Sequence, residues 1–327
     1  MTSSAPAPTD GLALATRGLV KRFGPRRALA GLDLSVPSGV VYGFLGPNGA
    51  GKTTTMRILT GLIHADAGQV ELLGAPFERG DTKRLFQVGA LIESPAFYPY
   101  LSGRANLRAL ASTGAPTPGR RVDELLETVG LADRARDKVA GYSLGMKQRL
   151  GIGAALLSDP RLLLLDEPAN GLDPAGIVGM RDMLRSLAAS GKTVFVSSHL
   201  LAEVQQLADV VGIIAAGRLV REGPIGPMLA GEGHVRVLVR PDEVAPATAA
   251  IEPVAGSDSV SSSLEHEGAW LTVRFEPTRS AEINRALALA GIYAARVEAG
   301  TDLESLFLEL TGPGPGTEAP AGFGGVS

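Results

Sequence analysis

The sequence predicts an α/β fold with a parallel sheet at its centre, followed by a smaller second unit. Three apolar, β-rich runs each lead into a polar loop or a helix, at Gly39–Leu45, Leu162–Asp166 and Thr193–Ser197. Unbroken hydrophobicity along a short strand is typical of parallel strands that are covered on both faces. A chain of 327 residues is long enough for one large domain and a smaller one.

Composition argues against several classes of function. The 31 Lys and Arg residues are balanced by 34 Asp and Glu residues, so the net charge of -3 provides no general attraction to nucleic acid. The chain has no cysteine, which removes disulfides, thiolate metal sites and thiol nucleophiles. Residues 1–10 lack the regions of a secretory signal and are expected to form a flexible leader. No apolar run is long and unbroken enough to cross a bilayer, so we expect any membrane role to depend on a partner subunit.

The elements of the first unit follow in order along the chain. After the run at Gly39–Leu45 come a Gly-rich loop and a helix at about Lys52–Leu59, which Gly61 ends. Helical patterns then dominate from about Gly103 to Leu157, and Val122–Gly130 is the clearest of them. We therefore expect a helical insert between the early and the late strands.

A second unit is predicted after a linker at Gly223–Gly233. Alternating or β-rich segments indicate strands, and apolar periodicity indicates helices; in chain order these are His234–Arg240, a helix at Glu243–Ile251, strands near Asp258–Leu264 and at Trp270–Phe275, a helix at Ala281–Ala290, and a strand at Tyr293–Val297. This α+β succession is compatible with β-α-β-β-α-β, the order of a ferredoxin-like split unit. Residues 313–327 are too rich in Gly and Pro to be buried and are expected to be disordered.

The loop between the first strand and the first helix carries a phosphate-binding motif. Residues Gly46, Pro47, Asn48, Gly49, Ala50, Gly51, Lys52 and Thr53 match G-x-x-x-x-G-K-[ST] in full, and the motif lies between a predicted strand and a predicted helix, as it must. Glycines let successive backbone N–H groups and the helix N-terminus face the phosphates, while Lys52 reaches the β- and γ-phosphates. Thr53 is expected to ligate Mg²⁺, and Thr54 to join the nucleotide contacts. The alternative, a Gly-rich turn that happens to end in Lys-Thr, is disfavoured by this context.

Two carboxylates follow the buried run at Leu162–Asp166. Asp166 stands at the end of the predicted strand, where it can hold the Mg²⁺ that bridges the phosphates. Glu167 is then placed to polarise or deprotonate the attacking water. The alternative is a strand end with solvated acids, which the phosphate loop makes improbable.

Two further segments point to a function only when they are taken together with the phosphate-binding motif and the two carboxylates. His199 follows the run at Thr193–Ser197 and can contact the γ-phosphate or the attacking water, although a lone histidine there is more often structural. Tyr142–Arg149 opens a helix with Ser143 and Gly145 and offers free N–H groups to an anion, although a serine cap before a basic helix is common.

The order of these segments resembles the ATP-binding subunits of ABC transporters over roughly residues 11–225. On this resemblance, Gly46–Thr53 is the Walker A loop, Tyr142–Arg149 is the signature, and Leu162–Asp166 is the Walker B strand, followed by the catalytic glutamate. The resemblance implies an α/β P-loop NTPase with a RecA-like parallel or mixed sheet. It implies an ATPase domain at 11–228 with a helical subdomain at about 95–160, and leaves 229–312 as an accessory domain.

The same resemblance assigns individual residues. Phe23 in KRFG corresponds to the aromatic that stacks on adenine, Gly171–Pro174 to the D-loop with Asp173 as a nucleotide contact, and His199 to the switch histidine. It implies a head-to-tail dimer of two copies, in which the signature of one copy closes on the ATP held by the other. Ser143, Gly145 and Met146 are then nucleotide contacts supplied in trans.

Two positions depart from the family pattern. Glu93 stands where the glutamine of the Q-loop is usual, and a carboxylate there can ligate Mg²⁺ while adding negative charge beside the triphosphate; the alternative is a plain surface acid. Leu144 and Met146 replace the usual Gly and Gln of the signature. With the ending Leu303–Thr311, these features resemble the subgroup that exports antibiotics of the multidrug, bacitracin and lantibiotic types.

These observations predict the ATP-hydrolysing subunit of an ABC exporter for an antibiotic or another amphipathic compound. The expected partners are a second copy of the chain and a separately encoded permease, the expected cofactors are ATP and Mg²⁺, and the expected location is the cytoplasmic face of the membrane. The alternatives are a soluble ABC ATPase that acts on ribosomes or DNA, and a regulator without turnover. The single Walker A motif and the absence of sustained heptads disfavour the first, and Glu167 with His199 disfavours the second.

Overall fold

The computed structural model describes residues 9–78, 80–93, 95–114, 118–230, 233–265 and 268–300, together with Leu303 and Phe307. The chain divides into two compact units, one up to Ile225 and one from Gly226 onward. Residues 1–8 of the expected leader and the whole expected tail at 313–327 lie outside the described residues, whereas Thr9 and Asp10 already belong to the first strand.

A six-stranded sheet forms the centre of the first unit, and its strands lie in the order β10-β9-β3-β8-β7-β6. The bounds are β3 Val41–Leu45, β6 Val88–Leu91, β7 Leu162–Asp166, β8 Thr193–Ser198, β9 Val210–Ala215 and β10 Arg218–Pro224. All neighbouring pairs are parallel except β9 and β10. The predicted parallel strands are thus confirmed, and their carboxyl ends meet at one edge, where ligands of open α/β sheets bind.

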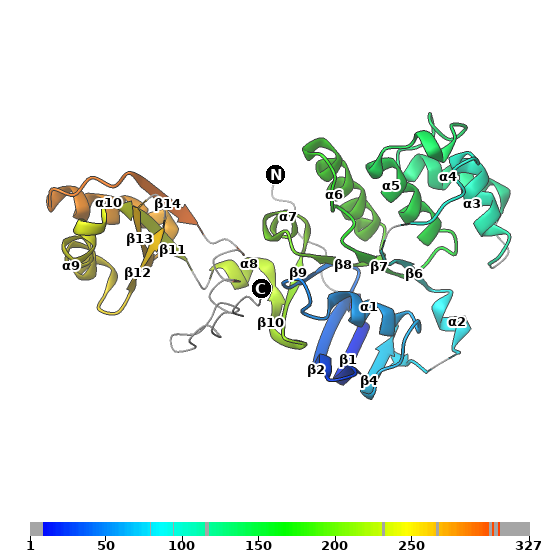
Figure 1. Cartoon of the computed structure of the whole chain (residues 1–327), viewed down its shortest axis with the longest axis horizontal. Coiled ribbons are helices and arrows are strands. Elements are labelled where there is room, and N and C mark those ends of the chain that lie inside the picture. The colour runs from blue at the N-terminus through cyan, green and yellow to red at the C-terminus, as the bar shows by residue number, and fades with distance from the viewer. Residues whose placement is uncertain are drawn as a thin grey trace, which may run out of the picture. The chain divides into compact units, whose positions relative to one another are not determined.

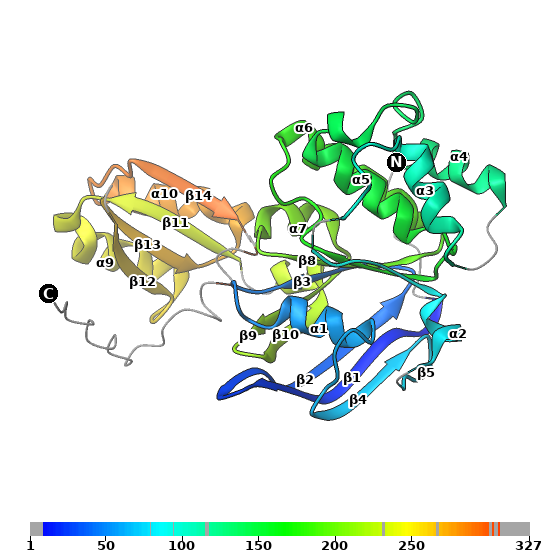
Figure 2. The same ribbon diagram turned by 45° about the vertical axis from the view of Figure 1, so that its right-hand side comes forward.

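A second, antiparallel sheet in the order β2-β1-β4-β5 was not anticipated from the sequence. Its strands are β1 Thr9–Phe23, β2 Arg26–Ser38, β4 Ala67–Leu72 and β5 Ala75–Pro76. Figures 1 and 2 show helix α1 (Lys52–Leu59) between this sheet and the six-stranded sheet. Buried residues of α1 and of both sheets share one hydrophobic cluster, so α1 is held from two sides.

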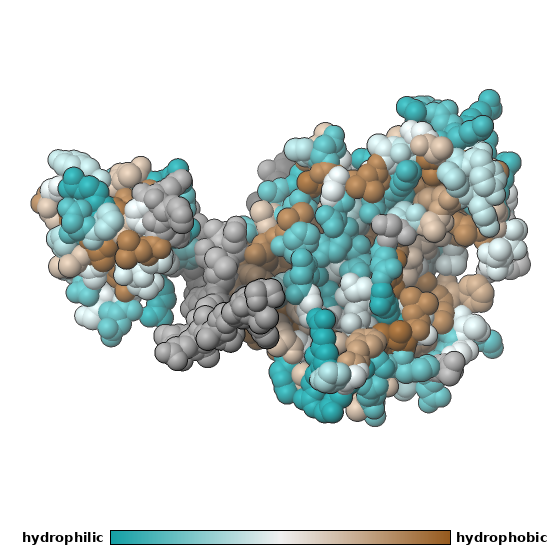
Figure 3. Space-filling view, in the orientation of Figure 1, coloured by the Kyte–Doolittle hydropathy of each residue, from teal (hydrophilic) through white to brown (hydrophobic). Residues whose placement is uncertain are grey.

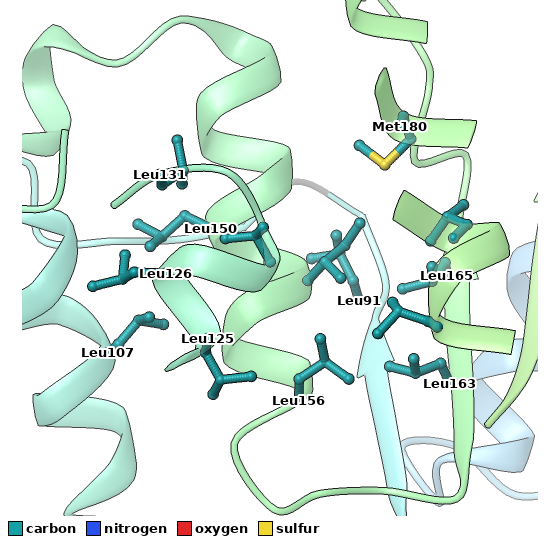
Figure 4. Close-up of a cluster of buried hydrophobic side chains, with 14 of the residues drawn as sticks. Leu91, Leu107, Leu125, Leu126, Leu131, Leu150, Leu156, Leu163, Leu165 and Met180 are labelled. Atoms are coloured by element: carbon teal, nitrogen blue, oxygen red, sulfur yellow. The ribbon is translucent and has the colours of Figure 1, made fainter. Parts of the chain in front are cut away.

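Helices lie on the opposite side of the six-stranded sheet, some directly on its strands and others packed on those helices. They are α3 Gly103–Ala111, α4 Gly119–Thr128, α5 Leu144–Ala155, α6 Pro174–Ala189 and α7 Leu201–Leu207, while the short α2 (Thr82–Leu85) and the 3₁₀ turn η1 (Val139–Gly141) lie in connections. Strand β7 divides its side chains between the two cores: Leu162 and Leu164 belong to the cluster around α1, and Leu163 and Leu165 to the cluster of the helices (Figure 4). This alternation is what a strand covered on both faces requires.

The second unit has the succession β-α-β-β-α-β in a four-stranded antiparallel sheet of order β12-β13-β11-β14. Its elements are β11 His234–Val239, α9 Val244–Ala255, β12 Val260–Glu265, β13 Gly268–Arg274, α10 Ser280–Leu289 and β14 Arg296–Gly300, with 3₁₀ turns η2 Pro241–Glu243 and η3 Pro277–Arg279. Alternate residues of β11 and β13 pack with both helices in a core of their own. The expected linker at Gly223–Gly233 was wrong for its first part, because β10 runs to Pro224 and helix α8 occupies Ile225–Ala230.

Among the described residues, no helix combines the length and the apolar character needed to cross a bilayer. Hydrophobic and hydrophilic residues are interspersed over the face drawn in Figure 3.

Candidate functional site

The phosphate loop connects β3 to α1 at the carboxyl edge of the six-stranded sheet. Gly49 and Gly51 have φ angles of 82° and 114°, a region that glycine enters without strain. A Cβ atom on Gly51 would also lie 2.8 Å from the carbonyl oxygen of Ala28, so a side chain has no room there. In the rest of the loop, Gly46 and Ala50 are buried, Pro47 and Asn48 are exposed, and Thr53 and Thr54 are half-buried.

Lys52 is the buried cation of this loop. Its side chain is 6% exposed, and its Nζ atom donates a hydrogen bond to the carbonyl oxygen of Gly46 at 2.6 Å. A second contact joins Nζ to Oε1 of Glu167 at 3.4 Å. Lys52 therefore sits between the loop backbone and the carboxylate that follows β7.

Asp166 ends β7 beside the first turn of α1. Its Oδ2 atom accepts a hydrogen bond from the hydroxyl of Thr53 at 2.7 Å, and its Oδ1 atom accepts one from the hydroxyl of Ser197. Asp166 is only 8% exposed. Both of its carboxylate oxygens are therefore held by hydrogen bonds and largely shielded from solvent. Two of the three residues predicted to ligate Mg²⁺, Thr53 and Asp166, are thus in direct contact.

Glu167 lies between a cation and an imidazole. Its Oε2 atom is 2.7 Å from Nδ1 of His199, while its other oxygen faces Lys52. The backbone at Glu167 has φ +48°, an uncommon conformation for a residue with a side chain, and its N–H donates to the hydroxyl of Ser197 at 3.0 Å. Backbone strain of this kind concentrates at functional sites, where surrounding contacts hold it in place. Lys52, Glu167 and His199, the three predicted catalytic residues, therefore form one chain of contacts.

Phe23 lies at the end of β1, where the hairpin to β2 brings it opposite Arg26. Its ring is 48% exposed, and Nζ of Lys21 lies 5.5 Å from the ring centroid. Arg26 in turn reaches the phosphate loop, because its Nη2 atom lies 3.5 Å from the carbonyl oxygen of Gly49. An exposed aromatic ring whose strand partner reaches the phosphate loop is suited to stacking on a base.

The signature residues lie elsewhere in the same unit. Ser143 caps α5, and its hydroxyl accepts a hydrogen bond from the N–H of Met146 at 3.3 Å. A Cβ atom on Gly145 would lie 3.3 Å from the side chain of Leu172, which places the signature beside the D-loop. Asp173 caps α6 by accepting from the N–H of Gly176 at 2.9 Å.

The fold separates the signature from the phosphate loop of its own chain. Helix α5 packs in the cluster of the helical face, whereas α1 packs in the cluster on the opposite face of the six-stranded sheet. Among the described residues, no hydrogen bond or ion pair joins Ser143, Gly145 or Met146 to Gly46–Thr53.

Glu93 follows β6 with φ +66°, and its carboxylate forms an ion pair with Arg57 of α1. It is thus placed beside the helix that carries Thr53, but its partner is a guanidinium and not Thr53 or Asp166. Arg57, Arg26 and Ser197 were missed by the sequence reasoning. The spacing of Arg57, four residues after Thr53 on one helix, is a signal that could have singled it out.

One further acid stands near the catalytic residues. Glu203 of α7 has a raised pKa, chiefly because burial disfavours its charged form, with the charge of Glu167 raising the pKa further and His199 opposing both. Within the described parts of the chain, no cluster of three or more His, Cys, Asp and Glu side chains forms a ready-made metal cage.

Comparisons with known proteins point to one family. The family model described as ABC transporter matches residues 29–170. The bacitracin transport ATP-binding protein BcrA of Bacillus licheniformis is 47% identical over 210 residues, which cover 64% of this chain and 69% of that protein. The daunorubicin resistance ATP-binding protein DrrA3 of Streptomyces coeruleorubidus is 39% identical over 306 residues, covering 92% and 96%. A solved structure of an ATP binding subunit of an ABC transporter is 28% identical with a TM-score of 0.59, covering 67% of this chain and 92% of that one.

Proposed function

The chain belongs to the ABC transporter family as an ATP-binding and ATP-hydrolysing subunit, and from that premise we propose that it drives export of an antibiotic or another amphipathic compound. The relatives named for bacitracin transport and daunorubicin resistance support this class of substrate. The observation that carries the catalytic part is the chain of contacts from Lys52 through Glu167 to His199, beside the phosphate loop. A carboxylate that can accept a proton from water, a cation for the phosphates and an imidazole that orients the carboxylate together suit in-line attack of water on a γ-phosphate.

The donor atoms at Thr53 and Asp166 fit Mg²⁺. This ion prefers oxygen ligands and is usually held by one or two protein oxygens together with substrate phosphates. The hydroxyl and the carboxylate are 2.7 Å apart; Thr53 lies in the first turn of α1, directly after the phosphate loop, and Asp166 is the last residue of β7. Thr53 and Asp166 would hold Mg²⁺ there, and the ion would supply positive charge that stabilises the negative charge developing on the phosphates.

The chain's own residues supply the remaining chemistry. When ATP binds, the ammonium group of Lys52 leaves the carbonyl oxygen of Gly46 and donates to the phosphates. A hydrogen bond between two charged groups is stronger than one to a neutral carbonyl. Glu167 accepts a proton from the attacking water, and His199 orients that carboxylate through its contact with Oε2. The exposed ring of Phe23 stacks on the adenine.

A second copy of the chain completes the site. The proposal rests on the separation of the signature from the phosphate loop by the sheet, since Ser143 and Gly145 open the helix that packs on the face opposite to α1. A head-to-tail arrangement supplies the signature in trans, and the free N–H groups at the start of α5 then meet the γ-phosphate of the partner's ATP.

Transport further requires a separately encoded permease, and we place the chain at the cytoplasmic face of the membrane in contact with it. Among the described residues, the exposed aromatic pair Tyr98 and Tyr100, which follows Glu93 closely in the chain, is a suitable contact surface. Action on ribosomes or DNA is not favoured, because the matched relatives are named for transport or drug resistance and the net charge is -3.

Antibiotic susceptibility tests this function directly. A host that carries the chain together with a candidate permease gene is expected to tolerate a higher concentration of at least one amphipathic antibiotic. Replacement of Glu167 by Gln should remove the gain, whereas Glu127→Gln, on the exposed side of α4, should keep it. Equal tolerance with and without Glu167 across a broad panel would contradict a transport role that depends on hydrolysis.

A further inference from the structure

A cavity of about 220 Å³ lies between helices α6 and α7 of the first unit. Most of its lining is apolar, and both helices contribute side chains, among them Ile177, Val178, Met180, Leu184, Val204 and Leu207. An apolar cavity of about 150 Å³ is large enough to bind benzene, whereas sites for drug-sized molecules begin at about 300 Å³. The space therefore suits a compact molecule with one ring.

The cavity opens to solvent and adjoins both catalytic segments. Val178 lines it and is 45% exposed, so a ligand can enter past this side chain. Pro168, which directly follows Glu167 in the chain, forms part of the wall. Another part is formed by Ala202, which follows His199 closely at the start of α7. A molecule in the cavity would therefore touch segments that adjoin both Glu167 and His199.

Glu203 brings a carboxylate to this mostly apolar lining. Within the described ranges, no hydrogen bond or ion pair engages that carboxylate. Burial raises the pKa of the group, with the charge of Glu167 adding to the effect and His199 opposing it. A partly buried carboxylate without a donor is stabilised by a ligand that supplies a positively charged N–H group.

The lining also includes the charged side chain of Arg181 in α6, which already has partners. Its guanidinium donates to the side-chain oxygen of Gln206 in α7 and lies 4.0 Å from the carboxylate of Asp182. A second bridge joins the same helices, because Nη2 of Arg185 donates to the carbonyl oxygen of Gln206 at 2.5 Å. Glu203, and not Arg181, is thus the group that favours a charged ligand, and the favoured ligand is a cation.

We propose that this cavity binds a compact amine, with its ring among the apolar side chains and its ammonium group at Glu203, and that the bound amine slows ATP hydrolysis. A ligand shifts the chain toward the arrangement in which its own site is formed. Rearrangement of the segments beside Glu167 and His199 then becomes less favourable, because it would have to reshape an occupied cavity. Binding of the amine requires neither a permease nor a second copy of the chain.

The probe for binding is phenethylamine, and phenethyl alcohol is a neutral control of nearly the same size. An NMR titration of the full-length chain measures both affinities. At neutral pH, phenethylamine is expected to bind about fivefold more tightly than the alcohol, which is the effect of one partly exposed charge pair. Phenylpropionate carries a negative charge and is expected to bind most weakly of the three.

Two substitutions test the two parts of the site. Glu203→Gln keeps the shape of the side chain, and it is expected to remove the advantage of the amine while the alcohol binds as before. Val178→Trp fills the opening and is expected to abolish saturable binding of both probes. Val220→Trp is the matched control, since Val220 is a valine of β10 that is 41% exposed and does not line the cavity.

Phosphate release from ATP measures the effect on hydrolysis. Saturating phenethylamine is expected to lower the rate of the wild-type chain roughly fivefold, at the lower end of typical couplings between two sites. The concentration that gives half of this effect should equal the dissociation constant from the titration. Phenethylamine should leave the rate of the Val178→Trp chain unchanged and should slow the Val220→Trp chain as it slows the wild type.

Two kinds of result would overturn the proposal. If the amine keeps its advantage over the alcohol in the Glu203→Gln chain, or binds the Val178→Trp chain unchanged, it binds elsewhere. If it binds as expected and phosphate release does not slow, the cavity has no control over hydrolysis. Circular dichroism melting of each variant shows that the fold is retained, and Glu203→Gln decides alone if Val178→Trp fails to fold.

Discussion

Glu167 is the residue on which hydrolysis depends in this scheme. Its carboxylate is held from both sides, with Oε1 at 3.4 Å from Nζ of Lys52 and Oε2 at 2.7 Å from Nδ1 of His199. Ser197 fixes the backbone through its hydroxyl, which also donates to Asp166. A general base must be held within hydrogen-bond reach of its water, and these contacts limit its movement.

Replacement of Glu167 by Gln keeps the shape of the side chain and removes the base. We expect the rate of ATP hydrolysis to fall at least about 100-fold, while ATP binding is preserved. Phosphate release and binding of a fluorescent ATP analogue measure the two effects. The exposed Glu127→Gln is the control, and hydrolysis by the Glu167 variant at the wild-type rate would contradict the assignment of the base.

Glu203, which lies near the site, makes the free energy of unfolding depend on pH. Its folded-state pKa is raised above the ordinary 4.5, chiefly by burial, so the folded chain holds this proton more tightly than the unfolded chain. Ionisation therefore destabilises the fold as pH rises above 4.5. Glu203→Gln is expected to have the higher free energy of unfolding at about pH 7, with a difference that shrinks as the pH falls toward the ordinary pKa. Urea denaturation at several pH values measures this difference. A difference that does not change with pH would argue against this charge effect.

Close contacts between elements hold α5 against the sheet. Gly89 of β6 is buried, and a Cβ atom there would lie 2.2 Å from the carbonyl oxygen of Ala155 at the end of α5. The backbones approach because no side chain separates them. The signature at the start of the same helix is thus supported by the packing at its other end.

Gly89→Ala is expected to destabilise the chain by about 1–3 kcal/mol, because backbone atoms must move apart. Gly141→Ala is the matched control, since a Cβ there meets nothing within 4 Å. Thermal melting of both variants measures the difference. Equal melting temperatures would show that the contact has room to relax.

Elements whose signals are local were predicted best from the sequence. The strands β3, β7 and β8 are short, fully buried runs, and the phosphate loop is one contiguous motif. The pair β1 and β2 was missed, since its register shifts repeatedly and the inward–outward alternation is broken along it. Contacts across distant segments, such as Ser197 with Asp166 or Arg57 with Glu93, depend on tertiary structure and leave no local pattern.

At the scale of the whole molecule, the helices that follow the phosphate loop and the signature pack on opposite faces of the central sheet, and we propose that the two segments are halves of one site. The phosphate loop continues into α1, and the signature opens α5 in the other core cluster. Two copies arranged head to tail would bring each half to the complementary half of the partner. The central claim is that hydrolysis requires this exchange.

Mixing two inactive variants tests that claim most directly. Lys52→Ala disables the phosphate loop, and Ser143→Asp disables the signature by placing a negative charge where the phosphate of ATP would lie, while aspartate still caps α5. Ser102→Asp, at the cap of α3, is the control for the substitution itself. Lys52→Ala and Ser143→Asp should each be inactive alone, whereas the control should keep its activity.

The measured quantity is the rate of phosphate release from an equal mixture of the two inactive variants. We predict recovery to roughly a quarter of the wild-type rate, because half of randomly formed dimers are mixed and each mixed dimer holds one complete site. A mixture no more active than its separate components would contradict a site shared between two copies.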